Sequence, residues 1–195
     1  MVNYPNSKRS YKKQLTSHSN RGMSFEKLIN ESNDYYRSHE LAVIHKKPIP
    51  IQIVKVNYPS RQTAVIKEAY YKIPSTTDYN GVYKGWHIDF EAKETVNKTS
   101  FPLRNIHLHQ IKHMLDIDAQ GGIAFVIIHF KQFDEIYVLE INALQQFVDR
   151  GKTGRKSISY EEIKKEGYLV PNTFAPRVDY LKIVDKLINK KKLEK

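Results

Sequence analysis

Apolar residues recur at helical spacing in four parts of the chain. Phe25, Leu28, Ile29 and Tyr36 fall on one face of a helix, and Ser24 can cap its first turn. Gly121 and Gly122 follow the helical pattern at 103–118 and predict its end. The predicted helices cover about 24–38, 103–118 and 158–166, and an amphipathic tail follows at 178–195.

Segments rich in β-branched and aromatic residues lie between these helices. The segment at 123–130 is continuously apolar, as expected for a strand that is covered on both faces. The segment at 135–141 follows closely after 123–130, so these two strands are predicted to form a hairpin. Turn signals stand at Pro59 and at Asn80-Gly81. The predicted strands are 41–46, 51–56, 63–73, 85–94, 123–130 and 135–141.

This order of helices and strands predicts an α/β fold, with a mixed central β-sheet flanked by helices. The length of 195 residues suits one domain with a sizeable core. Residues 1–22 are rich in Asn, Ser, Lys and Arg and are predicted to form a basic, disordered arm, which leaves 23–195 as the single domain. Within it, the stretch at about 55–84 interleaves Lys, Arg and Tyr. We expect an insertion there, either a solvated hairpin or a projection into DNA.

The charge of the chain indicates a class of partner. Lys and Arg number 32 against 21 Asp and Glu, a formal net charge of +11 at pH 7. Such a field attracts nucleic acid or an anionic membrane surface, although it can also serve solubility alone. The absence of cysteine excludes disulfides and thiolate metal sites. Because no apolar run approaches the ~20 residues of a membrane helix and no signal peptide is visible, we expect a cytoplasmic location and no membrane association.

The predicted strand at 85–94 carries charge where a buried strand would carry apolar residues. Glu91 and Lys93 lie two residues apart and therefore point to the same face of the strand. Asp89 is expected on the opposite face, with Phe90 and Ala92. Taken alone, the Glu91 and Lys93 pair is also consistent with a surface ion pair of little energetic weight.

Asp78 changes the interpretation of this pair. It stands thirteen positions before Glu91, beside Thr76 and Thr77, and an intervening turn can fold it back toward that glutamate. Two converging carboxylates repel each other unless a cation lies between them, and oxygen ligands select a hard ion such as Mg²⁺ or Mn²⁺. A lysine nearby can stabilise the charge that develops on a phosphate. Asp78, Glu91 and Lys93 therefore predict a metal-dependent phosphodiesterase site.

Asp78 followed by Glu91-Ala92-Lys93 is similar to the D…(D/E)-x-K signature of restriction-endonuclease-like nucleases. Longer segments carry a more specific resemblance, namely RGMSFEKLINESNDYY, KIPSTTDYNGVYKGWHIDFEAKET, FPLRNIHLHQIKHM and GGIAFVIIHF. Together they resemble the RecU family of Holliday junction resolvases, over nearly the whole chain from Arg21 to about Leu187. The resemblance implies a restriction-endonuclease-like core with a protruding β stalk.

The resemblance also implies roles for individual residues. Asp78, Glu91 and Lys93 would be catalytic, with Lys93 stabilising the transition state of a magnesium-dependent cleavage in which Mn²⁺ can substitute. Glu26 would lie near the metal, behind its direct ligands. Residue spacing by itself does not identify Thr76 or Gln110 as a metal ligand. The implied metal ligands are Thr76, Asp78, Glu91 and Gln110.

The implied substrate is four-way junction DNA, nicked symmetrically during recombination and repair. Two symmetric nicks require two symmetric sites, in keeping with the homodimer that the resemblance implies. Recombinase and branch-migration proteins are implied as further partners. Basic residues of the arm, of the 55–84 insertion and of a loop at 149–157 would contact phosphates and position the DNA. The predicted DNA-binding residues are Arg9, Arg21, Arg61, Lys67, Tyr70, Lys72, Arg155 and Lys156.

Two other functions stay open on the sequence. A non-cleaving junction-binding or architectural protein would bind a synthetic junction without nicking it. A sequence-specific restriction enzyme would cut linear duplex at a fixed site. A zinc site is disfavoured, because His109 and His113 have the spacing of a metal-binding helix but lack the HExxH pattern.

Overall fold

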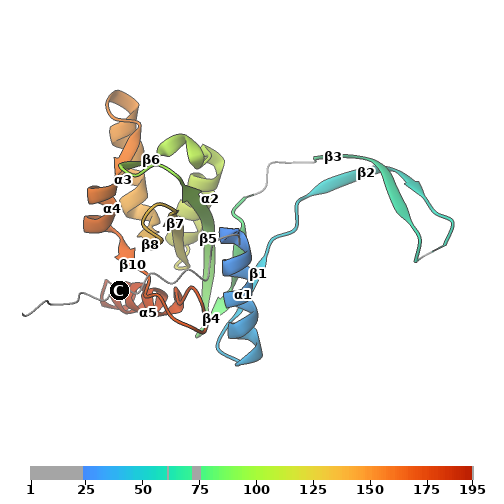
Figure 1. Cartoon of the computed structure of the whole chain (residues 1–195), viewed down its shortest axis with the longest axis horizontal. Helices are drawn as coiled ribbons and strands as arrows, with labels where there is room; N and C mark the ends of the chain where they lie inside the picture. The colour runs from blue at the N-terminus through green and yellow to red at the C-terminus, as the bar shows by residue number, and fades with distance from the viewer. Residues whose placement is uncertain (1–23, 61, 72–75, 195) are drawn as a thin grey trace, which may run out of the picture.

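The computed structural model describes residues 24–60, 62–71 and 76–194, and the predicted arm at 1–22 lies outside these ranges. Within them, no helix is both long and apolar enough to cross a membrane. The elements, in chain order (Figure 1), are α1 (Phe25–Ser38), β1 (Val43–Lys46), β2 (Ile51–Asn57), β3 (Val65–Tyr71), β4 (Tyr79–Tyr83), β5 (Trp86–Thr95), β6 (Ser100–Pro102), the 3-10 helix η2 (Leu103–Asn105), α2 (Leu108–Ala119), β7 (Ile123–Phe130), β8 (Glu135–Glu140), α3 (Ile141–Thr153), β9 (Ser157–Ser159), α4 (Tyr160–Glu166), β10 (Tyr168–Leu169) and α5 (Leu181–Leu193).

A mixed six-stranded sheet forms the centre of the molecule, with the strand order β1-β4-β5-β7-β8-β10. β5 and β7 run parallel, and the other neighbours are antiparallel. α2 lies between β5 and β7 in the chain, because parallel neighbours need a crossover connection. β7 is buried along its whole length and contributes to two hydrophobic cores, one beneath α1 and α5 and the other beneath α2, α3 and α4. The predicted α/β fold class, with helices on both faces of a mixed sheet, is confirmed.

α1 forms where the apolar spacing predicts it. The Ser24 hydroxyl accepts a hydrogen bond from the Lys27 amide at 3.3 Å, which caps the first turn. Phe25, Leu28 and Tyr36 are buried in the core on this side of the sheet. The helix therefore covers one face of the sheet and presents its first turn near the start of β4, where the Tyr79 hydroxyl lies 3.5 Å from a backbone carbonyl oxygen of α1.

The second predicted helix begins later than its apolar pattern suggests. Residues 103–105 form η2, and α2 starts only at Leu108. His107 is the capping residue, and the side chain of Gln110 accepts its backbone amide hydrogen at 3.0 Å. The capping interaction, rather than the apolar spacing, fixes where this helix starts.

The sequence pattern does not predict α3. The helix starts at Ile141, directly where β8 ends, so that no turn residue separates the strand from the helix. It continues to Thr153 and includes the first part of the segment 149–157, which is predicted as a loop. That prediction is wrong for Arg150 and Lys152, which are helical, and it holds only for the residues just after the helix.

The Asn80-Gly81 pair lies inside β4, so the prediction of a turn there is wrong. The turn between β4 and β5 instead consists of Lys84 and Gly85, whose φ angles are 50° and 80°. Two successive residues with positive φ match the twist of a tight two-residue hairpin. The β4–β5 hairpin therefore positions the Thr76–Asp78 segment beside the middle of β5.

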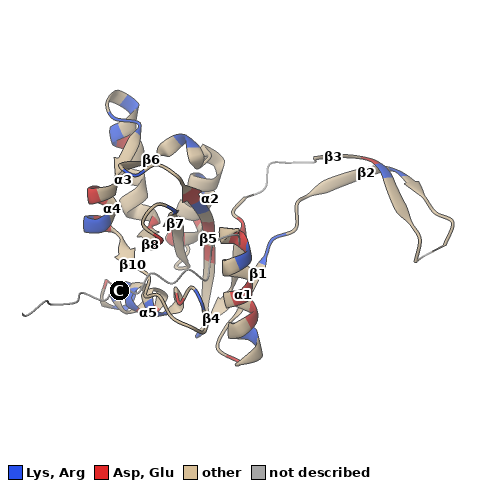
Figure 2. Ribbon diagram, in the orientation of Figure 1, with Lys and Arg blue, Asp and Glu red and all other residues tan. Residues whose placement is uncertain are grey.

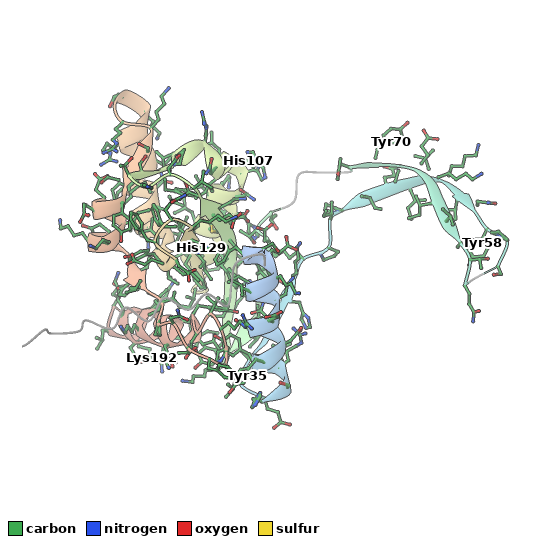
Figure 3. All side chains as sticks on the ribbon, in the orientation of Figure 1. Tyr35, Tyr58, Tyr70, His107, His129 and Lys192 are labelled. Carbon is green, nitrogen blue, oxygen red and sulfur yellow. The ribbon has the colours of Figure 1, made fainter. Side chains whose placement is uncertain are left out.

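β2 and β3 form a separate two-stranded sheet that projects from the rest of the molecule (Figure 1). All residues of these two strands, 51–57 and 65–71, are exposed, and we call them the ribbon. Figure 3 shows Tyr58 and Tyr70 on this projection, far from the core. The insertion predicted at about 55–84 overlaps the ribbon, but it also includes β4, which belongs to the central sheet.

Candidate active site

β5 carries two of the predicted site residues on the face that α2 covers. Glu91 is in register with Val126 of β7, and Lys93 is in register with Ile128. Val126 and Ile128 belong to the core beneath α2, α3 and α4, and partners in neighbouring strands share a face of the sheet. Glu91 and Lys93 therefore point toward the α2 side.

Asp78 comes directly before β4, whose first residue, Tyr79, pairs with Phe90. This register brings the Thr76–Asp78 segment alongside Glu91. The backbone amide of Asp78 donates a hydrogen bond to Glu91 Oε2 at 2.9 Å. The structure thus brings together Asp78 and Glu91, two carboxylates that are thirteen residues apart in the chain.

Glu91 is fully buried, and its surroundings shift its acidity. Burial raises the pKa of Glu91 to about 7, since a charged carboxylate loses its hydration there. Lys93, whose Nζ lies 2.5 Å from Glu91 Oε1, lowers this pKa, whereas the neighbouring charge of Asp78 raises it. A carboxylate in this position gains from a cation more than an exposed one does.

The geometry of Glu91 fits a hard metal ion. Its Oε1 atom is buried and lies 2.5 Å from the Lys93 ammonium, while its Oε2 atom accepts the hydrogen bond from the Asp78 amide. A buried carboxylate next to a second carboxylate is a donor set that Mg²⁺ and Mn²⁺ prefer. The described residues contain no group of three or more His, Asp or Glu side chains arranged to hold a metal. Other oxygen donors would have to complete the coordination.

Thr76 and Gln110 are the predicted additional donors, and both make protein contacts. The Thr76 hydroxyl accepts a hydrogen bond from Lys47 Nζ at 3.1 Å. Gln110 is buried in the first turn of α2, where its oxygen accepts the capping bond from His107. One turn further along, His113 lies 3.3 Å from Asp89, so this side of α2 faces β5. Gln110 therefore lies on the correct face of the helix, but its oxygen would have to leave the cap to bind a cation directly.

The prediction that Asp89 faces away from Glu91 is wrong. Asp89 is in register with Ala124, which belongs to the core beneath α2, and its Oδ2 lies 2.8 Å from Lys47 Nζ. Its other oxygen accepts a hydrogen bond from the buried Thr77 hydroxyl. The alternation of side chains along a strand, applied consistently, places residues 89, 91 and 93 together. By contrast, no spacing signal in the sequence indicates the contribution of Lys47.

Glu26 lies at the edge of this site. Its Oε1 is 2.5 Å from Lys46 Nζ, and its side chain is more than half exposed. The pKa of Tyr79 is raised by burial first and then by the negative charges of Glu26, Asp78 and Glu91. All three acids therefore act on one tyrosine hydroxyl, which places Glu26 near the carboxylate pair but in an ion pair of its own.

The predicted DNA-binding residues are spread over distant parts of the molecule. Lys67 and Tyr70 lie on the exposed ribbon, where the Tyr70 hydroxyl donates to Glu68 at 2.6 Å. Arg155 and Lys156 are exposed just after α3, where Figure 2 shows basic residues at the end of that helix. The other predicted contacts, Arg9, Arg21, Arg61 and Lys72, lie outside the described residues.

Arg150 is not a free phosphate contact. It pairs with both carboxylate oxygens of Glu162 and donates to the Ser157 carbonyl at 2.9 Å. Its guanidinium also lies over the Phe147 ring, 4.9 Å from the centroid. These contacts join α3 to β9 and α4 and give Arg150 a structural role.

Sequence comparisons connect this geometry to known proteins. The family described as Recombination protein U, RecU, matches residues 20–186. Proteins named Holliday junction resolvase RecU from Bacillus thuringiensis (strain Al Hakam) and Bacillus cereus (strain AH820) are each 56% identical to this chain over 193 residues. These alignments cover 94% of this chain and 96% of each relative. The matched range includes Asp78, Glu91 and Lys93.

Proposed function

Because this chain belongs to the RecU family, we propose that it is a magnesium-dependent endonuclease that resolves Holliday junctions by symmetric nicking. Resolution of junctions follows from the names of relatives that align along almost the whole chain. The observation that carries the metal-dependent chemistry is the buried Glu91 carboxylate, held by the Asp78 amide and lying beside the Asp78 carboxyl group and the Lys93 ammonium.

Asp78 and Glu91 would hold the Mg²⁺ ion, with Thr76 and Gln110 as further oxygen donors, and Mn²⁺ would substitute for Mg²⁺. A bound metal supplies an activated water and a positive charge on the scissile phosphate. The protein contributes a preformed pair of acids, and a bound cation would favour the ionised form of Glu91. The hydrogen bond from the Asp78 amide fixes the orientation of the Glu91 carboxylate before any ligand arrives.

Lys93 would act on the phosphate rather than on the metal. Its side chain is about a quarter exposed, so the ammonium can reach solvent and an incoming ligand. In the reaction, the Lys93 ammonium would offset the negative charge that develops on the phosphate oxygens. The same ammonium thus pairs with Glu91 in the structure and would take part in the reaction.

Symmetric nicking requires two equivalent sites, and a homodimer provides them. The ribbon supports this proposal, because Ile51, Ile53 and Val54 are 45%, 50% and 55% exposed there. An isolated two-stranded sheet is marginally stable in water, and apolar side chains in such numbers favour coverage by another surface. In a dimer, paired ribbons would meet the junction, with Lys67 and Tyr70 facing the DNA.

Substituting the acids tests the proposed chemistry. Asp78→Asn and Glu91→Gln should each reduce Mg²⁺-dependent junction cleavage at least about 100-fold, because a metal supplies several kcal/mol of transition-state stabilisation. Binding of a labelled four-way junction without divalent ions should stay within about twofold of wild type, since phosphate contacts dominate affinity. Gel-based cleavage and binding assays measure both quantities.

Asp116→Asn is the matched control, because Asp116 forms an exposed ion pair with Lys112 on α2. It should cleave like the wild type. Nicking by Asp78→Asn or Glu91→Gln at the wild-type rate would refute the assigned site. A wild-type protein that binds the junction but never nicks it in Mg²⁺ would instead support the non-cleaving, architectural function.

A further inference from the structure

Lys47 forms a partly buried connection beside the proposed metal ligands. It follows β1 directly, and its side chain is only 15% exposed. The ammonium donates to Thr77 Oγ1 at 2.6 Å, to Asp89 Oδ2 at 2.8 Å and to Thr76 Oγ1 at 3.1 Å. A lysine ammonium has three hydrogens, so these three acceptors use its whole donor capacity. Lys47 is therefore not available to contact a phosphate.

The backbone of Lys47 reaches the same segment. Its amide donates to the Asp78 carbonyl at 2.7 Å, while the Asp78 amide donates to Glu91. The peptide groups on both sides of Asp78 are thus fixed, one by the end of β1 and the other by β5. The Lys47 side chain adds the hydroxyls of the two preceding threonines to this arrangement.

The buried carboxylate of Asp89 holds the Lys47 ammonium in place. Its side chain is 1% exposed, and a buried carboxylate without a close positive charge is strongly destabilising. Lys47 is the closest cation to it, and the Nε2 atoms of His113 and His87 lie 3.3 Å and 3.8 Å from the same oxygen. The charge of Asp89 therefore holds the ammonium in place, and the ammonium holds the threonines.

We propose that Lys47 is a positioning residue for the reaction: anchored by Asp89, it holds the Thr76–Asp78 segment in the geometry that binds the divalent cation. This inference rests on the proposed function, and it adds two residues, Lys47 and Asp89, that touch neither metal nor DNA. Their effect is transmitted through Thr76, Thr77 and the backbone of Asp78. Loss of the connection lowers affinity for the cation without altering the contacts that bind the junction.

The first experiment compares Lys47→Met with the wild-type full-length protein. Binding of Mn²⁺ alone, followed by electron paramagnetic resonance of the free ion, should weaken about 10- to 100-fold, the usual effect of removing a group that orients metal ligands. The Mg²⁺ concentration for half-maximal junction cleavage should rise by a similar factor, so that excess Mg²⁺ restores part of the rate. Junction binding without divalent ions should stay within about twofold.

Lys47→Arg tests whether charge alone is sufficient. The planar guanidinium retains the charge but cannot direct three hydrogens at acceptors arranged around one nitrogen. We therefore expect Lys47→Arg to keep most of the thermal stability and still bind Mn²⁺ more weakly than wild type. Lys84→Met is the control, because Lys84 forms an exposed ion pair with Asp185 and should leave Mn²⁺ binding unchanged.

The double variant Lys47→Met/Asp89→Asn separates positioning from folding. Removing the negative charge of Asp89 removes the unpaired buried carboxylate, so the melting temperature should recover relative to Lys47→Met. Mn²⁺ affinity should stay low, because the threonines still lack their donor. Recovery of both quantities would reduce Lys47 to a purely structural residue and overturn the inference.

Wild-type Mn²⁺ affinity in folded Lys47→Met would also overturn the inference. The proposed function has its own test, because Asp78→Asn and Glu91→Gln must lose cleavage whatever Lys47 does. If those two variants lose cleavage and Lys47→Met binds Mn²⁺ normally, only the positioning role fails. If Asp78→Asn and Glu91→Gln cleave normally, the site itself is wrong.

Discussion

Two glutamates of this protein have pKa values displaced in opposite directions. Burial raises the pKa of Glu91 to about 7, and hydrogen bonds from Arg150 and from the Ser159 backbone lower that of Glu162 to about 2. The first displacement marks a carboxylate whose burial removes more hydration than the neighbouring Lys93 ammonium replaces. The second marks a carboxylate that is fully satisfied and contributes to stability.

Glu162→Gln should reduce stability only where the native glutamate is charged. Its folded pKa of about 2 lies below the ordinary 4.5, so its contribution is present above pH 4.5 and is lost as the pH falls toward 2. Because the pair with Arg150 is partly exposed, we expect a loss of about 1 kcal/mol at pH 7. This corresponds to a melting temperature about 3 °C lower.

Differential scanning calorimetry of both proteins between pH 7 and pH 2.5 measures this difference, which should shrink with falling pH. Lys164→Met, which removes a partner of the exposed Glu161, is the control and should show no such trend. A difference that stays constant, or grows, toward low pH would contradict the assignment.

At the residue scale, the sequence predicts groups of residues whose types suggest a shared chemistry. It does not predict contacts that depend on how distant segments pack. Asp78, Glu91 and Lys93 can be selected because two acids and a lysine have a recognisable joint chemistry. Lys47 and Asp89 are 42 residues apart, and nothing in either residue's neighbourhood indicates that they meet. Such contacts arise only when β1 and β5 take their places on either side of β4.

Within β4, Gly81 has no room for a side chain. At Gly81, a Cβ atom would lie 2.0 Å from the Val43 carbonyl oxygen and 2.6 Å from the Ile44 Cα. These are backbone atoms of β1, which cannot move away without breaking the pairing of the two strands. The pairing in turn holds Lys47 at the end of β1, beside the Thr76–Asp78 segment.

Gly81→Ala should therefore cost about 3 kcal/mol or more, because the added methyl group forces β1 away from β4. Gly85→Ala provides the comparison: no atom lies within 4 Å of its added Cβ, but its φ of 80° costs about 1 kcal/mol for a side chain. Chemical denaturation measures both losses. Equal losses would mean that β1 can adjust, in contradiction to the close approach seen at Gly81.

Element types were easier to predict than their boundaries. Long, regular apolar patterns identify α1 and β7, because tertiary packing and local pattern agree there. The sequence pattern does not predict α3, because β8 leads into it without an intervening turn. It does not predict β4 either, because the Asn-Gly pair in this strand is a turn signal in most contexts. In both places tertiary packing overrides the local signal.

The whole molecule combines a closely packed core with an exposed projection. Glu91 is buried between the sheet and α2 with the half-buried Asp78 beside it, whereas every residue of the ribbon strands is exposed. The class of this fold follows from the order of helices and strands, since alternating patterns leave few arrangements. The strand order and the separation of the ribbon from the central sheet depend on pairings between distant segments, which the sequence pattern does not specify.

If the ribbon pairs with a second copy, charge on its apolar side should prevent the pairing. Ile51→Lys/Ile53→Lys places two charges on one face of β2, and we expect a dissociation constant at least about 100-fold weaker. Sedimentation velocity of the purified protein measures it. Because both side chains are exposed in the single chain, the melting temperature of the monomer should stay within about 2 °C of the wild-type monomer.

Gln52→Lys is the matched control, because Gln52 lies between these two residues and points to the other face of the strand. It should leave the association unchanged. A double-lysine variant that remains dimeric at the wild-type concentration would show that another surface joins the copies.

The ribbon forms a sheet of its own, with a bulged register between β2 and β3 and no strand shared with the catalytic core. Its length and side chains can therefore change during evolution without retuning the acidity or the geometry of Glu91. Descendants of this architecture could acquire a new preference among branched substrates while inheriting an unaltered cutting chemistry.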